Sequence, residues 1–515
     1  MKPAALALLT ALLVLPSPAA AQRPAIDATW IFEVPPVRPL PPGQRAEPVA
    51  DPYEDKVVET AHMVRIGGQE VRYTAAAGSI PLRDGAGKGL AHVFFVAYTR
   101  DGAGDPATRP ITFAFNGGPG SASIWLHMGA LGPRRVEMSG DGFQPAPPFK
   151  LVDNAFSILD VTDLVMIDPV STGYSRAAAG QDPKLFHGSS PDIQAVAEFI
   201  RTYTTRYRRW PSPKYLLGES YGTTRSAGLS AELQQRHGIE LNGIILVSAV
   251  VDFGSQEYAP GHDLAYCTYL PTLTATAWYH KKLPTELQGD LQKAIAEAKA
   301  FALGDYMLAL ARGNRLTDAE RRAVAARLAR YTGLSPEFIL RSHLRVTDAR
   351  FRKELLRDQG VMVGRLDGRY TGLDADAAGE RQEFDPSNSA LQGAYTAMFS
   401  EYVRRELKYE NDVKYETSGP VRPWSYAEFQ NRYVNMMEPL RSAMARNPYL
   451  KVLVANGYYD MATPFFSTEY TFDHIGFEST YRDRVTMTFY EAGHMMYIRP
   501  SMLEQFKKDI AAFIE

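Results

Sequence analysis

A serine at position 220 lies in a sequence context that restricts the fold of this chain more than any other feature. The apolar run Tyr215 to Leu217 predicts a β-strand, the motif Gly-Glu-Ser-Tyr-Gly follows it over 218–222, and a helical pattern covers 224–237. When G-x-S-x-G joins a strand to a helix, its glycines permit a sharp turn that projects the serine hydroxyl from the end of the sheet. The context therefore predicts Ser220 as a nucleophile, whereas the motif alone would also fit a glycine-rich turn.

A serine nucleophile needs a general base, and the base needs a carboxylate that orients it. An apolar run over 452–455 leads to Asp460, and an alternating run over 485–489 leads to His494. Both residues follow predicted strands, where parallel sheets place their sites, and they occur in the order serine, acid, histidine. Separately they would fit a turn aspartate and a packed histidine. Together they predict a triad of Ser220, Asp460 and His494.

A glycine-rich loop offers backbone donors for the oxyanion of an acyl-transfer reaction. Asn-Gly-Gly-Pro-Gly over 116–120 follows the apolar run 111–115. Each oxyanion donor is worth about 3 kcal/mol, and the residue after the nucleophile, Tyr221, is expected to supply one of them. A phosphate-binding loop is the alternative, but the Lys-Ser/Thr pair of a P-loop does not follow, so nucleotide binding is not expected.

The order of apolar runs predicts an α/β fold with a mixed, mostly parallel central sheet. Strand-like runs between 63 and 98 are separated by Gly or Asp-Gly and predict antiparallel strands at one edge. From 111 to 251, short apolar runs alternate with amphipathic segments, as in parallel strands joined by helices. The helix-rich, charged stretch 258–418 departs from this alternation and is expected to be an inserted helical cap.

The N-terminus resembles a bacterial-type signal peptide. Lys2 precedes an apolar run over 4–15, and three alanines at 19–21 offer a cleavage site before Gln22. The run is too short to cross a bilayer, no other stretch qualifies as a membrane span, and a secreted or periplasmic location is expected. The expected organisation is a signal peptide at 1–21, a Pro-rich lead-in at 22–60, the first part of the core at 61–257, the cap at 258–418 and the second part of the core at 419–515.

Composition excludes several ligand classes. Fifty-six basic and 58 acidic side chains give a formal net charge of −2, so the charge pattern offers no nucleic-acid-binding patch. Peptide-like or small neutral ligands remain. The only cysteine, Cys267, cannot form an intramolecular disulfide and is expected to be a buried structural thiol. No histidine pair has a zinc-helix spacing with a glutamate, so no metal or other cofactor is expected.

Four motifs together resemble the serine carboxypeptidase family, which has the α/β-hydrolase fold. They are Asn-Gly-Gly-Pro-Gly at 116–120, Gly-Glu-Ser-Tyr-Gly at 218–222, Gly-Tyr-Tyr-Asp at 457–460 and Ala-Gly-His-Met at 492–495. The resemblance implies Ser220 as nucleophile, His494 as base, Asp460 as its orienting carboxylate, and Gly118 and Tyr221 as oxyanion donors. It also implies that Asn116 and Glu219 bind the terminal carboxylate of the substrate. Two carboxyl groups in contact must share a proton, which favours acidic pH.

Two positions depart from the family pattern. Ala114 stands where the family usually has a tryptophan, and Ala130 replaces a glutamate before Leu-Gly-Pro. Half of the family's carboxylate-binding network is therefore missing. Arg134, Arg135 or Arg225 could bind a carboxylate instead by charge-assisted pairing, although each also fits a structural or surface role.

The leading hypothesis is a serine-type carboxypeptidase that releases C-terminal residues from peptide substrates through an acyl-enzyme. Ala114 and Ala130 keep open a secreted esterase or acyltransferase on the same triad. A non-catalytic binding protein on a hydrolase scaffold is the third possibility.

Overall fold

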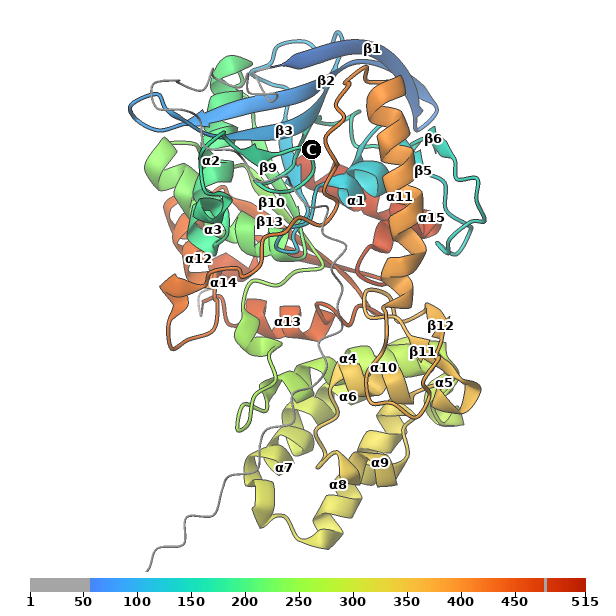
Figure 1. Ribbon diagram of the computed structural model, residues 1–515. Coiled ribbons are helices and arrows are strands. Elements are labelled where there is room, and N and C mark those ends of the chain that lie inside the picture. The colour runs from blue at the N-terminus through green and yellow to red at the C-terminus, as the bar shows by residue number, and fades with distance from the viewer. Residues whose placement is uncertain (1–55, 477–478) are drawn as a thin grey trace, which may run out of the picture. The chain divides into compact units, whose positions relative to one another are not determined.

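The computed structural model describes residues 56–476 and 479–515 (Figure 1). The expected signal peptide and nearly all of the expected Pro-rich lead-in lie outside these ranges. Within the described residues, no helix is both long and apolar enough to cross a membrane.

A ten-stranded sheet forms the centre of the described unit. Its order is β1-β2-β3-β7-β4-β9-β10-β13-β14, with β8 paired to β3. These strands are β1 (Val57–Ile66), β2 (Gln69–Arg83), β3 (Gly89–Arg100), β4 (Ile111–Phe115), β7 (Asp163–Ile167), β8 (Arg176–Ala177), β9 (Lys214–Glu219), β10 (Gly243–Val247), β13 (Lys451–Gly457) and β14 (Val485–Tyr490). Strands β1 to β3 are antiparallel, β7 is antiparallel to β3, and all pairs from β7 to β14 are parallel. The prediction of a mixed, mostly parallel sheet is confirmed.

Helices cover both faces of the sheet because its central strands are apolar on both sides. One face packs against α2 (Ser189–Arg206), α3 (Tyr221–His237) and α12 (Met437–Arg446). The other packs against α1 (Ile124–Leu126), α11 (Pro386–Arg405) and α15 (Pro500–Ile514). The nucleophile strand β9 is buried along its whole length between these two layers. A strand held in this way fixes the position of the residue that follows it.

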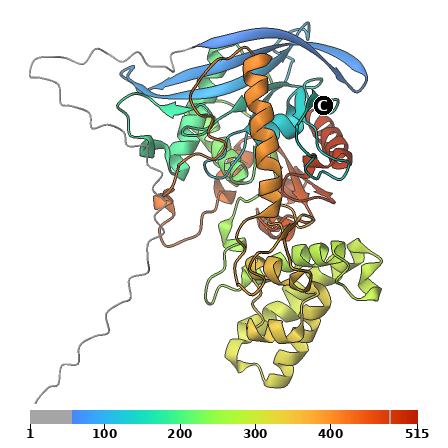
Figure 2. The same cartoon turned by 45° about the vertical axis from the view of Figure 1, so that its right-hand side comes forward.

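A group of helices from the predicted cap lies at the lower end of the described unit in Figure 2. Its buried apolar side chains form one cluster with Tyr459, Met461, Phe465 and Phe466. The group consists of α4 (Leu264–Tyr279), α5 (Thr285–Gln288), α6 (Leu291–Phe301), α7 (Met307–Arg312), α8 (Asp318–Thr332), α9 (Pro336–Arg341) and α10 (Asp348–Glu354). A capping box between Thr317 and Glu320 starts α8. Cys267 is buried in α4 as expected, and burial raises the pKa of its thiol to about 12, which disfavours the reactive thiolate.

The C-terminal end of the predicted cap differs from the sequence-based expectation. Helix α11 was grouped with the cap, but its buried aromatic residues Tyr395, Phe399 and Tyr402 belong to the same cluster as the sheet. Their spacing places them on one helical face, and the Tyr402 hydroxyl lies 3.0 Å from that of Tyr98 in β3. Strand β1 likewise begins at Val57, inside the expected lead-in, because its β-branched residues pair with β2.

The smaller elements connect these layers. They are β5 (Arg134–Val136), β6 (Leu151–Asp153), β11 (Val361–Val363), β12 (Thr371–Leu373), α13 (Phe465–Asp473) and α14 (Ser479–Arg482). The short hairpin of β11 and β12 leaves the cap and brings its connecting loop, residues 364–370, to the end of the sheet where β13 terminates.

Candidate active site

Ser220 occupies the sharp turn between β9 and α3. Its φ of 60° and ψ of −130° are unusual for a residue with a side chain. A Cβ at Gly218 would overlap the carbonyl of Gly222, so the turn requires the small residues of the motif. The Ser220 amide donates a 3.0 Å hydrogen bond to the Val247 carbonyl at the end of β10. The neighbouring strand therefore holds the turn in place.

His494 and Asp460 meet beyond the ends of β14 and β13. The Nδ1 of His494 lies 2.7 Å from Oδ2 of the fully buried Asp460. Backbone amides of Ala462 and Thr463 donate to Asp460 Oδ1 at 2.8 and 3.0 Å, and the Thr463 hydroxyl donates to Oδ2 at 2.7 Å. With its proton on Nδ1 facing the carboxylate, the neutral ring keeps Nε2 free to accept a proton.

The charge balance around His494 favours the protonated ring. Burial lowers the pKa of His494, but the charge and hydrogen bond of Asp460 outweigh it, and Glu219 adds a smaller effect, so the pKa lies above the ordinary 6.5. Arg365 acts in the opposite direction. The buried carboxylate can therefore stabilise the imidazolium that forms when the base takes a proton.

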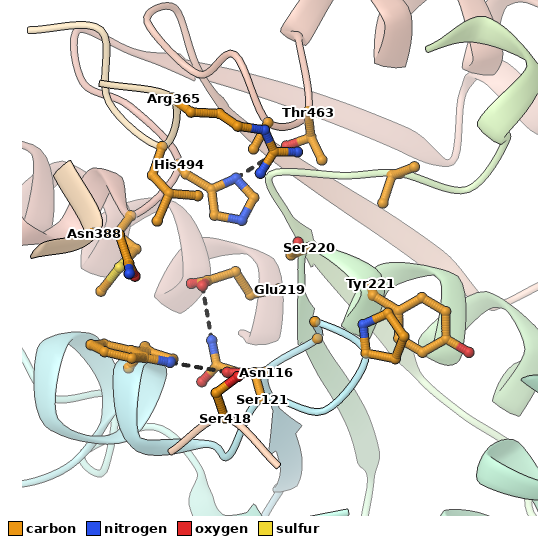
Figure 3. Close-up of a pocket in the computed structure, with 18 of the residues that line it drawn as sticks. Asn116, Ser121, Glu219, Ser220, Tyr221, Arg365, Asn388, Ser418, Thr463 and His494 are labelled. Carbon is orange, nitrogen blue, oxygen red and sulfur yellow. Dashed lines mark hydrogen bonds between the residues drawn. The ribbon is translucent and has the colours of Figure 1, made fainter. Parts of the chain in front are cut away.

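One cavity of about 440 Å³ brings the predicted residues together. Its lining includes Asn116, Glu219, Ser220, Tyr221 and His494 (Figure 3) and also Gly118. Asp460 contacts the Nδ1 side of the His494 ring and is not part of the lining. The residues come from the ends of β4, β9 and β14 and from the start of α3, so the C-terminal edge of the parallel strands forms the site.

The glycine loop packs directly against the start of α3. A Cβ at Gly117 would overlap the backbone nitrogens of Tyr221 and Gly222. Gly118 has a φ of 103°, a conformation that favours glycine. Tyr221 is the first residue of α3, and the first N–H groups of a helix have no acceptor within the helix. The loop and the helix start therefore present backbone donors at the same edge of the cavity.

Asn116, Glu219 and Tyr497 form a buried hydrogen-bonded network beside Ser220. The amide of Asn116 donates to Glu219 Oε1 at 2.8 Å, and the Tyr497 hydroxyl donates to Oε2 at 2.6 Å. The side-chain oxygen Oδ1 of Asn116 accepts from the Leu126 backbone amide at 3.1 Å. Burial raises the pKa of Glu219 to about 7, although His494, Tyr497 and Asn116 act to lower it. Tyr497 was not predicted, because nothing in a lone tyrosine three residues after a histidine indicates this contact.

The three arginines suggested as carboxylate ligands do not line the cavity. Arg225 forms a buried ion pair with Asp192, with a distance of 2.7 Å between Nε and Oδ2, and donates to the Asn116 carbonyl at 2.7 Å. Arg134 pairs with Asp153 and Glu406. Arg135 donates to the Val136 carbonyl at 3.4 Å. The structure therefore does not bring any of these three arginines to the cavity.

Replacing Arg225 with methionine should destabilise the protein, because it leaves Asp192 buried without its cation. We expect the free energy of unfolding, measured by chemical denaturation, to fall by about 3–5 kcal/mol. Arg236→Met on the same helix is the control, because Arg236 is exposed and its ion pair with Glu232 is long at 3.5 Å, so its effect should stay within about 0.5 kcal/mol. Equal losses in the two variants would contradict a structural role for Arg225.

The loop between β11 and β12 holds both catalytic turns. The His494 amide donates to the Leu366 carbonyl at 2.6 Å, and the Met461 amide donates to the Arg365 carbonyl at 3.0 Å. The Gly493 amide donates to Asp367 Oδ2 at 3.1 Å. These contacts were not predicted, since the residues in contact lie 96 to 128 positions apart in the sequence.

The chain resembles known serine carboxypeptidases. A family model described as serine carboxypeptidase matches residues 69–501. Serine carboxypeptidase-like 34 from Arabidopsis thaliana is 25% identical, over 43% of this chain and 44% of that protein. Carboxypeptidase sxa2 from Schizosaccharomyces pombe is 28% identical, over 27% of this chain and 26% of that protein. The chain thus matches less than half the length of these curated relatives.

A solved structure shows the same fold. Kex1(Δ)p, a prohormone-processing carboxypeptidase from Saccharomyces cerevisiae, aligns with a TM-score of 0.52 and 17% identity, covering 85% of this chain and 91% of that one. At this identity the likeness concerns the arrangement of the sheet and its helices.

Proposed function

Because this chain belongs to the serine carboxypeptidase family, we propose that it releases C-terminal residues from peptides through an acyl-enzyme. One observation carries the proposal: Ser220 and His494 line the same cavity, and the buried Asp460 binds the far side of the His494 ring. A nucleophile, a base and an orienting carboxylate in this order are what acyl transfer by a serine requires.

The proposed reaction begins when His494 Nε2 takes the Ser220 proton and Oγ attacks the carbonyl carbon of the last peptide bond. The backbone N–H groups of Gly118 and Tyr221 bind the oxyanion. As the C–N bond breaks, the imidazolium gives its proton to the leaving amine, and the C-terminal residue departs. His494 then takes a proton from a water molecule, which attacks the acyl carbon of the ester. As the C–Oγ bond breaks, the imidazolium returns the proton to Ser220 Oγ and the shortened peptide departs. Asp460 stays ionised and stabilises the imidazolium in both halves.

We propose that Asn116 and Glu219 bind the terminal carboxylate of the substrate. Their position beside Ser220 supports this role, as does the pKa of Glu219 at about 7, which burial raises. A carboxylate can approach Glu219 only when that side chain is protonated, because two adjacent negative charges repel each other. Recognition should therefore be present below pH 7 and be lost as the pH rises through this value.

A comparison of free acids with amides across pH tests the proposal. The substrates are an N-blocked dipeptide and its C-terminal amide, assayed from pH 5 to 9. We expect kcat/KM for the free acid to exceed that for the amide below pH 7, and the ratio to fall as Glu219 ionises, by up to about tenfold per pH unit. The titration of His494 affects both substrates equally and cancels in the ratio.

Glu219→Gln is the matched variant for this measurement, because it removes the titrating group and keeps the side-chain size. Its ratio of free acid to amide should not change between pH 5 and 9. A ratio near one at every pH in the unsubstituted enzyme would instead favour the esterase or general acyl hydrolase suggested by Ala114 and Ala130.

We also propose that residues 1–21 direct export and that the enzyme works in the periplasm or outside the cell. The apolar run and the alanines before Gln22 support this location. Cell fractionation tests it, and an enzyme found only in the cytoplasm would contradict it.

A further inference from the structure

Arg365 places a positive charge at the cavity that contains Ser220. Of the described residues that line this cavity, Arg365 is the only arginine or lysine. Figure 3 places it beside His494, and its charge is close enough to lower the pKa of that ring. A guanidinium remains charged at every physiological pH. The cavity therefore has a fixed cation next to the catalytic base.

The backbone of Arg365 is held from two sides. Its amide donates to Asp385 Oδ1, at the start of α11, at 3.0 Å, and its carbonyl accepts from the Met461 amide at 3.0 Å. Met461 directly follows Asp460, so the turn that contains the triad aspartate also fixes the backbone of Arg365. A charged side chain on a fixed backbone gives up less conformational freedom when it binds a ligand.

The guanidinium of Arg365 has no ion-pair or hydrogen-bond partner within residues 56–476 and 479–515. The lining also contains two glutamates and one histidine, which are Glu219, Glu257 and His494. None of them forms an ion pair with Arg365. Arg225 differs, because its guanidinium forms a buried ion pair with Asp192. The guanidinium of Arg365 is thus free to bind an anion in the cavity. Its two parallel N–H donors match the two oxygens of a carboxylate.

The two oxygens of Glu219 accept from Asn116 and Tyr497, so this network can hold one carboxylate through a shared proton. We propose that Arg365 binds a second carboxylate of the substrate, an acidic side chain on one of the two residues that flank the scissile bond. The inference rests on the proposed peptidase function and specifies its substrate class as peptides with an acidic residue at or next to the C-terminus. An ion pair of this kind needs no shared proton, because the guanidinium is always charged and the carboxylate is ionised.

Matched pairs of peptides test the inference. N-blocked Glu-Ala is compared with Gln-Ala for the residue before the scissile bond, and Ala-Glu with Ala-Gln for the residue after it. The unsubstituted enzyme should prefer the acidic member of at least one pair, and Arg365→Gln should reduce that preference by about 10- to 100-fold, as expected for loss of a charge-assisted contact. Arg365→Lys keeps the charge and should retain part of the preference.

Arg322→Gln is the control for the loss of one positive charge, because Arg322 is exposed on α8 and does not line the cavity. It should keep the preference of the unsubstituted enzyme. The use of ratios removes any general effect of Arg365 on His494, which acts on both members of a pair.

The affected pair identifies which flanking residue contacts Arg365, and either result supports the inference. Equal loss by Arg365→Gln on acidic and neutral members, or no loss on either, would overturn it even if the peptides are cleaved. Failure of the unsubstituted enzyme to cleave any of the four peptides would overturn the proposed function itself, and the inference with it.

Discussion

Replacing Ser220 with alanine should lower kcat for peptide hydrolysis by about 10⁴- to 10⁶-fold. The Ser220 hydroxyl attacks the substrate in the proposed reaction, and neither neighbour in the turn, Glu219 or Tyr221, can replace it as the nucleophile. Alanine keeps the Cβ in the same unusual backbone conformation, with φ at 60°, so the turn should survive. Single-turnover release of the C-terminal residue measures the loss, and a fluorophosphonate probe should label the unsubstituted enzyme but not the variant.

Ser190→Ala is the control, because this serine is exposed and its hydroxyl binds only Glu428 at the surface. Both variants should unfold at nearly the same temperature as the unsubstituted protein, which separates loss of chemistry from loss of structure. Normal turnover by Ser220→Ala would remove the proposed mechanism. Labelling of Ser220→Ala by the probe would indicate a different nucleophile.

The positions of the triad residues could be predicted because each follows a strand whose apolar pattern is local. Ser220 comes directly after β9, and Asp460 and His494 follow within four residues of the ends of β13 and β14, so parallel strands place all three along one edge. The motif and strand patterns therefore predicted that these three residues lie at the same edge of the sheet. Their roles in the reaction remain proposals that the variants test.

The long-range contacts around the site could not be predicted, because they depend on where loops return to the sheet. Tyr497 contacts Glu219 from 278 residues away. The loop that carries Arg365 contacts the turns of Asp460 and His494 across the intervening helix α11 and the chain that follows it. The helix-rich, charged character of residues 258–418 predicts one cap that includes helix α11. Its aromatic face instead packs on the sheet, so tertiary packing determined its place.

Replacing Asp460 with asparagine should lower kcat by about 10⁴-fold at neutral pH, through a change in the histidine tautomer. Ala462 and Thr463 both donate backbone amides to Oδ1, so an asparagine must place its carbonyl oxygen there. Its NH₂ group then occupies the Oδ2 position, 2.7 Å from His494 Nδ1 in the present structure. An amide donor at this position forces Nδ1 to accept, and the ring proton moves to Nε2. The nitrogen that should take the Ser220 proton is then already protonated.

Two readouts separate this mechanism from simple loss of structure. Asp412→Asn is the control, since Asp412 is exposed and pairs with Arg404 at the surface, and it should keep full activity. In Asp460→Asn, the imidazolium also loses the carboxylate that raises the pKa of His494, so the acidic limb of the kcat profile should move to lower pH while KM changes little. A fall in kcat of less than tenfold, or an unchanged acidic limb, would mean that His494 does not depend on Asp460 for its tautomer and charge. The Thr463 hydroxyl, which donates to Oδ2 in the present structure, can rotate and accept from the asparagine NH₂ instead, so the fall in kcat reports the change in tautomer and the shift of the acidic limb reports the lost charge.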